Sequence, residues 1–455
     1  MKKSNFSLNY SIENGEISYY NIIIKAKGSA FMKKKYTVAI LGTGGRGYAY
    51  GSLIKERPEE FEVVALCDRD AKQLEKENML FGLPEKAMFL SDTEFFKEKR
   101  ADVLIIATYD SYHLDQCIKA MKLGYDVLLE KPVSNSAEEI YELLKVQKET
   151  GRKVAVCHVL RYAPAFVKVS QLIKEGLVGK VVAIDALERV VYWHQAQAYV
   201  RLQSVHNNET FETILAKCCH DLDYIQHYAG SKCKSVSSVG GFDFFLPKNA
   251  PEGATKRCLD CPHNENCLFS AKKIYVDRWH ELGEPEFIWP FNKVTLDYPT
   301  TEEKLYKGLE TSEFGVCVYH SGVESNPGVT DHQLVQMHFE NGVDATLKMQ
   351  FCAESGRRVN IFGTHGEIVL DELYDTLEIK PFGKAKEVIK ISDITSKDAG
   401  FVHCGGDAGL INDLYAIVSG EKTNYTSLEE SVESHLIGIK AEESRLSGGV
   451  LKYIR

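Results

Sequence analysis

The stretch Tyr36–Gly47, YTVAILGTGGRG, is an apolar strand that breaks into a glycine-rich turn where a helix should begin. Gly42, Gly44 and Gly47 have the GxGxxG spacing, which suits a tight turn, a close approach of the backbone to a pyrophosphate and a close helix–strand contact. The unpaired N–H groups at the helix N-terminus would bind the phosphates. A glycine turn without a ligand fits the flanking strand less well. We therefore expect these residues to bind a dinucleotide: Gly42, Thr43, Gly44, Gly45, Arg46 and Gly47.

Length and composition limit the classes of protein to consider. The 455 residues exceed what a single hydrophobic core usually serves, so we expect two domains. The sequence is 44% hydrophobic and 26% charged, and its net charge of -9 argues against nucleic acid as a partner. No apolar run is long enough to span a bilayer, so we expect no membrane partner and a small molecule as the ligand.

The first 31 residues differ from the rest of the chain. Their one apolar piece, Ile22–Ile24, is too short for the core of a signal peptide. A second methionine, Met32, stands just before the first expected strand. We expect residues 1–31 to be a poorly ordered leader, with translation starting at Met32. The alternative is an appendage that adds an edge strand over residues 17–24.

A second strand is expected over Phe61–Cys67, and it ends in Asp68. A carboxylate there lies where the ribose 2′-OH of a dinucleotide arrives and would repel a 2′-phosphate, which favours NAD over NADP. Arg69 could instead pair with a 2′-phosphate or stack on adenine, so NADP stays open as the less favoured cofactor. Asp68 could also cap the following helix.

Buried strands then alternate with amphipathic helices, which predicts a doubly wound parallel sheet with helices on both faces. The strand Asp102–Ala107 runs into a polar loop. We expect Thr108 and His113 of this loop at the cofactor, because such sheets bind ligands at the carboxyl ends of their strands. The next strand, Tyr125–Leu129, runs into Glu130-Lys131-Pro132. A lysine at that strand end is placed to polarise a substrate hydroxyl.

Together, the GxGxxG turn, the acidic end of the second strand, the histidine loop and the EKP motif resemble the Gfo/Idh/MocA oxidoreductases, named for glucose-fructose oxidoreductase and inositol dehydrogenase. The resemblance implies an N-terminal Rossmann domain, residues 32–158, and a C-terminal α+β domain, residues 159–455, with an open, mostly antiparallel sheet. It makes Lys131 a catalytic or orienting residue and places Glu130 at the cofactor. It also implies a homo-oligomer, and a Lys131–Pro132 bond that is cis in relatives.

The C-terminal half opens on an alternating strand, Val181–Val191, typical of a sheet with one covered face. An aromatic and polar loop is expected after it, in which Tyr199 suits the face of a sugar and Arg201 suits a carboxylate. The alternative is that these residues only cover the end of the sheet. We also expect Tyr162, after the last Rossmann strand, to bind substrate.

A helix is expected over Thr213–Tyr228, with Lys217 and His220 on a polar face opposite an apolar one. The family's HxxD motif lies here, so the resemblance makes His220 the general base and Asp223 its support at the substrate. Histidine suits this task because its ordinary pKa lies near neutrality. Many sugar-oxidising relatives have an aspartate where this chain has Ala216, so Lys217 is a further catalytic candidate.

Most of the 12 cysteines stand alone in apolar runs, as buried thiols of a reducing compartment do, and we expect a cytoplasmic protein. Cys258, Cys261 and Cys267 differ, because C-x2-C-x5-C in a loop can wrap a zinc ion. His263 is the one other local candidate for the fourth ligand. We expect an insertion near residues 250–300 with a structural zinc; the alternatives are free thiols or one disulfide.

The remaining sequence supplies strands of the second sheet, which we expect at Gln333–Phe339, Ala345–Phe351, Arg358–Phe362 and Glu367–Leu370. Relatives often have a histidine facing the substrate pocket at the position of His403, which makes His403 a substrate-binding candidate. A last helix is expected over Ser431–Leu446, and in relatives it packs near the cofactor domain.

These residues predict an oxidoreductase that uses NAD to oxidise a ring hydroxyl of a sugar, cyclitol or glycoside. His220, with Lys217, takes the hydroxyl proton, while Lys131 orients and polarises the C–O group. A second hypothesis starts from the same oxidation: the ketone acidifies the neighbouring C–H, a base eliminates the anomeric substituent, and the stored hydride restores the alcohol, as in NAD-dependent glycosidases. A third, a non-catalytic sensor, predicts loss of the lysine or the histidine, and both are present.

Overall fold

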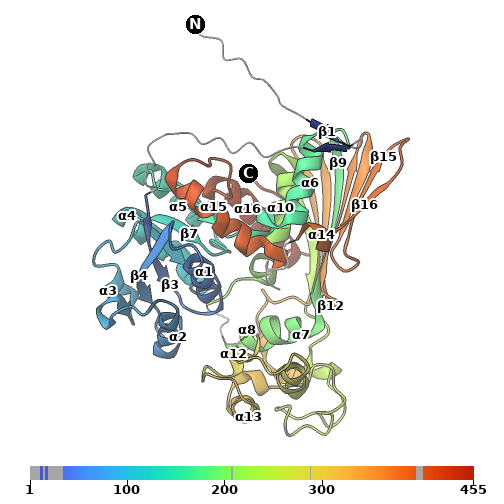
Figure 1. Ribbon diagram of the computed structural model, residues 1–455. Helices are drawn as coiled ribbons and strands as arrows, with labels where there is room; N and C mark the ends of the chain where they lie inside the picture. The colour runs from blue at the N-terminus through green and yellow to red at the C-terminus, as the bar shows by residue number, and fades with distance from the viewer. Residues whose placement is uncertain (1–10, 14–15, 19–33, 206–208, 287, 396–402) are drawn as a thin grey trace. The chain divides into compact units, whose positions relative to one another are not determined.

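The protein is seen in a computed structural model that describes residues 11–13, 16–18, 34–205, 209–286, 288–395 and 403–455 (Figure 1). The chain divides into two compact units, residues 1–34 and 35–455. Most of the expected leader and of the alternative edge strand over residues 17–24 lies outside the described residues. In the described part of that unit, β1 (Ser11–Glu13) and β2 (Glu16–Ser18) pair with each other as a two-stranded antiparallel sheet.

The first sheet of the larger unit is parallel throughout. Its six strands follow in the spatial order β5 (Met88–Phe89), β4 (Phe61–Cys67), β3 (Tyr36–Leu41), β6 (Val103–Ile106), β7 (Asp126–Leu129) and β8 (Val154–Val156). The chain order reverses between β3 and β6, and doubly wound sheets bind their ligands at the carboxyl side of such a switch point. The predicted doubly wound parallel sheet is confirmed.

Each strand of this sheet is apolar on both faces because helices cover both. One face packs on α4 (His113–Leu123) and α5 (Ala137–Thr150) through residues such as Ala39 and Leu104. The other packs on α1 (Gly45–Lys55) and α2 (Ala71–Phe81) through Val38, Ile40 and Ile105. A helix from the far end of the chain, α15 (Gly406–Ser419), joins α1 on this second face, as Figure 1 shows in red beside blue.

The second sheet is open and mostly antiparallel, as predicted (Figure 1). Its nine strands are, in spatial order, β16 (Glu387–Lys390), β15 (Thr376–Pro381), β14 (Gly366–Asp371), β13 (Gly356–Gly363), β9 (Val181–Val191), β12 (Asp344–Ala353), β11 (His332–Phe339), β10 (Cys233–Gly241) and β17 (Lys452–Tyr453). Only β9 and β12 run parallel, and they lie at its centre. Alternate residues of β11 and β12 are buried, so one face of the sheet packs on helices.

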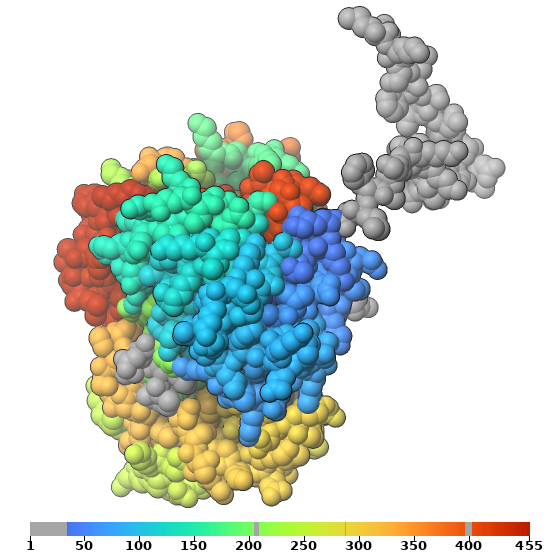
Figure 2. Space-filling view, turned by 90° about the vertical axis from the view of Figure 1, so that its left-hand side faces the viewer, coloured from blue at the N-terminus to red at the C-terminus, as the bar shows by residue number. Residues whose placement is uncertain are grey.

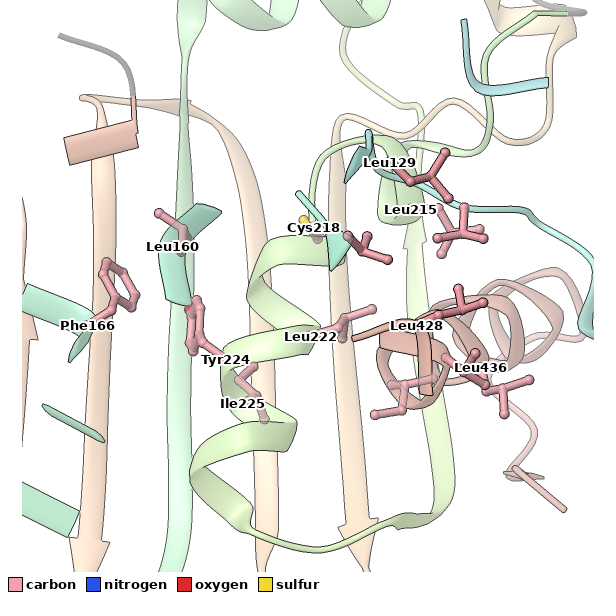
Figure 3. Packing of buried hydrophobic residues seen from close by; sticks show 14 of the residues in the cluster. Leu129, Leu160, Phe166, Leu215, Cys218, Leu222, Tyr224, Ile225, Leu428 and Leu436 are labelled. Carbon is pink, nitrogen blue, oxygen red and sulfur yellow. The ribbon is translucent and has the colours of Figure 1, made fainter. Parts of the chain in front are cut away.

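One continuous apolar core joins the two sheets. Helices α6 (Pro164–Lys174), α10 (Cys219–Ala229) and α16 (Leu428–Leu446) lie between them. Figure 3 shows Leu222 of α10 facing Leu428 and Leu436 of α16, with Leu129 of the parallel sheet nearby. Burial of that many large side chains, at about 25 cal/mol per Å² of apolar surface, fixes the helix that carries His220 against the cofactor domain.

The segment between β10 and β11, residues 242–331, forms an insertion with a core of its own. It contains α11 (Arg278–Glu281), α12 (Phe291–Val294) and α13 (Glu302–Thr311), packed around residues such as Phe245, Tyr275 and Leu305. Figure 2 shows it in yellow below the blue Rossmann domain and touching it. An ion pair of 2.7 Å between Lys72 of α2 and Asp297 crosses this boundary.

Two predicted elements differ from those observed. The aromatic loop after β9 is helical: α7 (Tyr192–His194) continues into a π-helical segment over Gln195–Arg201. The predicted single helix over Thr213–Tyr228 is broken into α9 (Thr213–Ala216) and α10. Among the residues that the structure describes, no helix combines the length and the apolar character needed to cross a bilayer.

Candidate active site

The glycine-rich turn between β3 and α1 has the backbone that a pyrophosphate site needs. Gly42 has a φ of +89°, and a Cβ on Gly47 would lie 2.0 Å from the carbonyl oxygen of Gly42, so the close contact of helix and strand requires glycine. Gly44 is the N-cap of α1; no side chain caps the helix there, and nothing lies within 4 Å of an added Cβ. The first N–H groups of α1 therefore have no side-chain cap, and such groups are the donors that a phosphate can bind.

Asp68 lies beside this turn at the end of β4. Its Oδ2 accepts hydrogen bonds from the Thr43 N–H at 2.6 Å and the Thr43 hydroxyl at 3.1 Å. Its Oδ1 accepts from the N–H of Asp70 at 2.9 Å. Asp70, rather than Asp68, caps α2, because its carboxylate accepts from the N–H groups of Lys72 and Gln73. The structure therefore corrects the alternative of Asp68 as the helix cap and leaves its charge next to the glycine turn.

Arg69, considered above as a partner for a 2′-phosphate, instead pairs with a carboxylate of the protein. Its guanidinium donates two hydrogen bonds to the Glu209 carboxylate, at 2.7 and 3.2 Å, and it lies 5.3 Å from the centre of the Tyr109 ring. Lys293 of α12 is close enough to Asp68 for their charges to interact: burial lowers the pKa of Lys293, and Asp68 opposes that shift. The insertion thus reaches the ribose end of the expected dinucleotide site.

The loop after β6 is held by His113. The ring is buried, with Nδ1 2.7 Å from the carbonyl oxygen of Pro132 and Nε2 3.1 Å from that of Thr108. The Thr108 hydroxyl in turn donates to Gln116 at 2.6 Å. His113 therefore ties this loop to the EKP segment, in which the Lys131–Pro132 bond is cis as expected. Both ring nitrogens thus contact backbone carbonyls, and the expected place of His113 at the cofactor stays a prediction.

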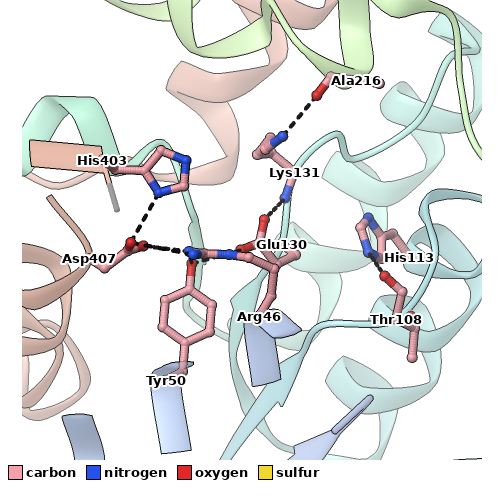
Figure 4. Close-up of polar contacts among 9 residues, drawn as sticks. All are labelled: Arg46, Tyr50, Thr108, His113, Glu130, Lys131, Ala216, His403 and Asp407. Atoms are coloured by element: carbon pink, nitrogen blue, oxygen red, sulfur yellow. Dashed lines mark hydrogen bonds and ion pairs between the residues drawn. The ribbon is translucent and has the colours of Figure 1, made fainter. Parts of the chain in front are cut away.

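Arg46, expected to touch the cofactor, joins the glycine turn to the rest of the site (Figure 4). Its Nε donates to Glu130 at 2.6 Å, and its terminal nitrogens contact both carboxylate oxygens of Asp407 on α15. Tyr50 adds a hydrogen bond to Glu130 at 2.7 Å. Burial alone would raise the pKa of Glu130, but Arg46 and Lys131 outweigh it and lower that pKa. Glu130 is therefore an anion that fixes this corner of the site.

Lys131 follows Glu130 at the carboxyl end of β7 and reaches the break between α9 and α10. Its Nζ donates to the carbonyl oxygen of Ala216 at 2.8 Å (Figure 4). In an unbroken helix that carbonyl would accept from the N–H of His220, so the break provides the acceptor that directs the lysine. The same break makes His220 a first-turn residue of α10, with Cys218 as the N-cap.

His220 is buried between two other imidazoles. Its ring centre lies 5.4 Å from that of His403 and 6.0 Å from that of His158. Burial first, and then the charge of Lys131, lowers the pKa of His220 well below its ordinary value. Neither ring nitrogen has a hydrogen-bond partner among the described residues. His220 is thus neutral at neutral pH, and both of its ring nitrogens are buried.

His403, by contrast, has a carboxylate partner. Its Nδ1 donates to Oδ2 of Asp407 at 3.0 Å, which leaves Nε2 as the acceptor (Figure 4). His403 and Cys404 both have a φ of +51°, which is uncommon for residues with a side chain and is found at functional sites. Asp407 would have a raised pKa from burial alone, but Arg46 and His403 lower it, so it stays an anion. An imidazole held by a carboxylate is the usual arrangement of a general base.

Lys217, the other catalytic candidate, belongs to a buried network of four charges. Its Nζ pairs with Glu188 at 2.9 Å; Arg357 pairs with Glu188 at 2.9 Å and with Asp221 at 2.8 Å. Burial would raise the pKa of Glu188, but Arg357 and Lys217 lower it. Lys217 therefore has a fixed ionic partner behind His220, and its contacts indicate a structural role in place of the expected catalytic one.

Three expected substrate ligands make contacts elsewhere. Arg201 is fully buried and donates to the carbonyls of Val316 and Phe269, so its guanidinium is inside the insertion and not at a substrate carboxylate. The Tyr162 hydroxyl bonds to Thr426 at 3.1 Å. Asp223 lies 3.6 Å from Arg161, and burial raises its pKa to about 6.

Tyr199 stays close to the expected site. Its ring lies 5.5 Å from that of His194, and burial, followed by the charges of Cys218 and Glu188, raises its pKa well above the ordinary value. His194 was not predicted. Burial lowers its pKa, and the charges of Lys217 and Lys131 lower it further, so His194 lies close to both lysines of the site.

Other residues of the site were also missed by sequence reasoning. His158 is the second residue after β8, as Lys131 is the second residue after β7, so the strand-end rule that selected Lys131 could have selected it. Cys219 carries no such signal in the sequence, whereas Asp407 ends the segment HCGGD, in which the resemblance already selected His403. Three possible metal ligands also lie close together: a ring nitrogen of His158, a ring nitrogen of His220 and Sγ of Cys219 are all within 4.8 Å of one another. Such a group could hold a metal ion.

Comparisons with known proteins agree with this geometry. Residues 36–158 match the family model described as an oxidoreductase family with an NAD-binding Rossmann fold, and residues 170–452 match the C-terminal α/β domain of the same family. These two matches cover most of the chain, including the glycine turn, Lys131, His220 and His403.

Individual relatives are more distant. The chain is 23% identical to a Bacillus subtilis protein named as an oxidoreductase, YteT, over 81% of this chain and 86% of that one. It is 29% identical to a glycosyl hydrolase family 109 protein of Stenotrophomonas maltophilia, over 34% of this chain and 36% of that one. A levoglucosan dehydrogenase, solved with NADH and levoglucosan, shares the fold with a TM-score of 0.64 at 14% identity, covering 92% of this chain and 100% of that chain.

Proposed function

The chain belongs to the Gfo/Idh/MocA family of oxidoreductases, and from that premise we propose that it oxidises a ring hydroxyl of a sugar, cyclitol or glycoside with NAD as the cofactor. The observation that carries the proposal is the meeting of Lys131, His220 and His403 at the carboxyl end of the parallel sheet. A neutral imidazole can accept the proton of an alcohol, and a cation beside it can stabilise the negative charge that develops on the oxygen.

The residues present fit a dinucleotide. The space around Gly44 and the uncapped N-terminus of α1 suit a pyrophosphate, and Asp68 suits a ribose diol. When bound there, NAD supplies the hydride acceptor at its nicotinamide ring. Asp68 favours NAD over NADP because a 2′-phosphate would meet its negative charge, and Glu209 already occupies the guanidinium of Arg69.

The chain's own residues handle the proton. In this proposal Lys131 donates a hydrogen bond to the substrate oxygen and stabilises negative charge that develops there. The histidine pair His220 and His403 accepts the hydroxyl proton; Asp407 orients His403 and stabilises its charged form. The buried surroundings lower the pKa of both imidazoles, so both are neutral before reaction.

A second function, an NAD-dependent glycoside hydrolase or lyase, is favoured by the number of acid–base groups. A net dehydrogenase needs one proton acceptor. A cycle of oxidation, elimination and re-reduction needs a base for the C–H proton and an acid for the leaving group. His158, His220 and His403 form a row of buried imidazoles that could share those two tasks. The similarity to a glycosyl hydrolase family 109 protein also favours this second function.

Turnover of aryl glycosides in the presence of NAD distinguishes the two functions. A dehydrogenase produces NADH in proportion to substrate oxidised and leaves the glycosidic bond intact. A hydrolase or lyase releases the aglycone while NADH stays at a catalytic level. Failure of both on a panel of sugars, cyclitols and glycosides, with the Lys131→Met variant as the background control, would contradict the proposal as a whole.

The homo-oligomer and the cytoplasmic location stay predictions. Static light scattering coupled to size-exclusion chromatography measures the first directly. A carbohydrate substrate also stays a proposal until the panel identifies one.

A further inference from the structure

The three cysteines of the insertion have a fourth close by in space. Cys258, Cys261 and Cys267 line one pocket together with Cys317, which follows 50 residues later in the sequence. We call the four residues the cysteine quartet. All four are free thiols in this structure, and Cys258 and Cys317 are buried. His263, the other candidate for a fourth ligand, directs Nε2 to the carbonyl oxygen of Glu252 at 2.7 Å.

Backbone pairing brings the quartet together. The segments of Arg257 and Val316 form an antiparallel bridge, in which the N–H of Cys258 donates to Gly315 and the N–H of Cys317 donates to Lys256, both at 2.9 Å. A tight turn follows, and the N–H of Cys261 donates back to the carbonyl of Cys258 at 3.2 Å. The pairing sets Cys258 and Cys317 on neighbouring strands, so the fourth sulfur is placed by the fold and not by local spacing.

The surroundings suit anionic sulfur. Arg201 is fully buried and donates from a terminal nitrogen to Sγ of Cys258 at 3.5 Å and to the carbonyl of Phe269 at 2.7 Å. A buried guanidinium beside ligand sulfur offsets the negative charge of thiolates and acts as an outer-shell hydrogen-bond donor. Aromatic side chains such as Phe269 and Tyr319 line the same pocket and limit access of water to the sulfur atoms.

The spacing of the thiols bears on which metal they hold. A zinc ion binds four thiolates at about 2.3 Å, which puts the sulfurs about 3.8 Å apart. Among the described residues, the one group of three or more such ligand atoms lying within 4.8 Å of one another is His158, Cys219 and His220, so the quartet is spread more widely. The four thiols border a cavity of about 20 Å³.

We propose that Cys258, Cys261, Cys267 and Cys317 hold an iron–sulfur cluster of the four-iron type. Such clusters are bound by four cysteine thiolates, with four iron atoms between them that keep the sulfurs further apart than one zinc ion does. The cluster holds together the two segments of the insertion that carry the quartet, and this insertion also supplies Asp297 and Lys293 to the edge of the Rossmann domain. This proposal is independent of the substrate and of the proposed reaction.

Metal analysis of the full-length protein tests the proposal. The protein is purified without oxygen, or reconstituted anaerobically with sulfide and equal amounts of ferrous and ferric iron, and assayed for iron, acid-labile sulfide, zinc and visible absorption. We expect about four irons and about four sulfides per chain, with a broad charge-transfer band in the visible spectrum. One zinc per chain with no uptake of iron would overturn the iron–sulfur assignment. Absence of any bound metal after reconstitution would overturn the site.

Two serine variants connect the metal to the quartet. Cys317→Ser should lose at least half of the iron and the visible band. Cys352→Ser, which changes an exposed thiol on β12, should keep both, and it is the matched control. Far-ultraviolet circular dichroism checks that each variant is folded. Should Cys317→Ser fail to fold, the acid-labile sulfide content of the wild type still decides the proposal. A folded Cys317→Ser protein with full iron content would refute the assignment of the fourth ligand.

Discussion

Replacing Lys131 with methionine should mainly lower activity, whereas replacing Lys217 with methionine should mainly lower stability. Both lysines lie near His220 and both are candidates for proton chemistry, but their contacts differ. Lys131 makes one hydrogen bond to a backbone carbonyl at 2.8 Å, whereas Lys217 pairs with the buried carboxylate of Glu188 at 2.9 Å. Methionine keeps the length and apolar stem of lysine and removes the charge, so the pair of variants isolates the role of each ammonium group.

The magnitudes follow from those contacts. Lys131→Met removes one hydrogen bond to a charged group, which should lower the free energy of unfolding by about 1–3 kcal/mol. It also removes the group expected to stabilise developing charge on the substrate oxygen, so kcat should fall roughly 10²- to 10⁴-fold. The Glu188 side chain is 2% exposed and pairs with two cations, Lys217 and Arg357. Lys217→Met leaves it with Arg357 alone. Loss of one partner of a buried ion pair costs about 3–5 kcal/mol, while kcat of the folded fraction should change only a few-fold.

Urea unfolding and steady-state turnover on the same preparations provide the assay. The substrate is whichever compound of the glycoside and polyol panel the wild type converts, with NAD in excess. A stable Lys217→Met protein that has lost as much activity as Lys131→Met would refute the assignment of Lys217 to the ion-pair network. A Lys131→Met protein with wild-type kcat would refute the role given to Lys131.

Three further predictions concern single residues. Asp68→Ser should lower the preference of kcat/KM for NAD over NADP by at least about tenfold, because it removes a negative charge close to the 2′-phosphate; an unchanged ratio would contradict the role of Asp68. Asp407→Asn should lower kcat by roughly 10²-fold or more with little change in KM for NAD, because His403 loses the carboxylate that orients it, and kinetics against both substrates test this. His435 accepts the N–H of Val133 on Nε2 and donates to the carbonyl of Ser431, and burial lowers its pKa from 6.5 to about 3. Its contribution to stability is therefore complete above about pH 6.5 and is lost as the pH falls toward 3, at up to about 1.4 kcal/mol per pH unit; urea unfolding from pH 7 to 4 should show a shallower slope for His435→Met, and parallel slopes would contradict this.

The parallel sheet could be read from the sequence because its signals are local. Strand β3 is an apolar run that ends in glycines, and the requirement for glycine at position 47 comes from a contact only five residues away. Lys131 could be selected for the same reason, since the residue after a parallel strand must lie at the ligand edge of the sheet. Strands β9, β11 and β12 alternate apolar and polar residues, and the structure has all of them where they were expected.

The break between α9 and α10 could not be predicted. Thr213–Tyr228 has helical periodicity throughout, and no proline or glycine interrupts it. The interruption coincides with two contacts from elsewhere in the chain: Lys131 bonds to the carbonyl of Ala216, and Glu188 of β9 pairs with Lys217. Local propensity amounts to a few tenths of a kcal/mol per residue, and tertiary contacts of this kind exceed it.

What the sequence by itself determined was the cofactor fold and the family, because both depend on short motifs whose backbone geometry is fixed within a few residues. Only the tertiary structure decided which charged groups are paired behind the site and which face a substrate. In the tertiary structure Asp407 pairs with Arg46 and His403, and the guanidinium of Arg201 lies inside the insertion. Cys317 lies beside the C-x2-C-x5-C loop. The physical reason is that a buried charge or thiol needs a partner within a few ångströms, and which residue supplies it depends on how distant segments pack.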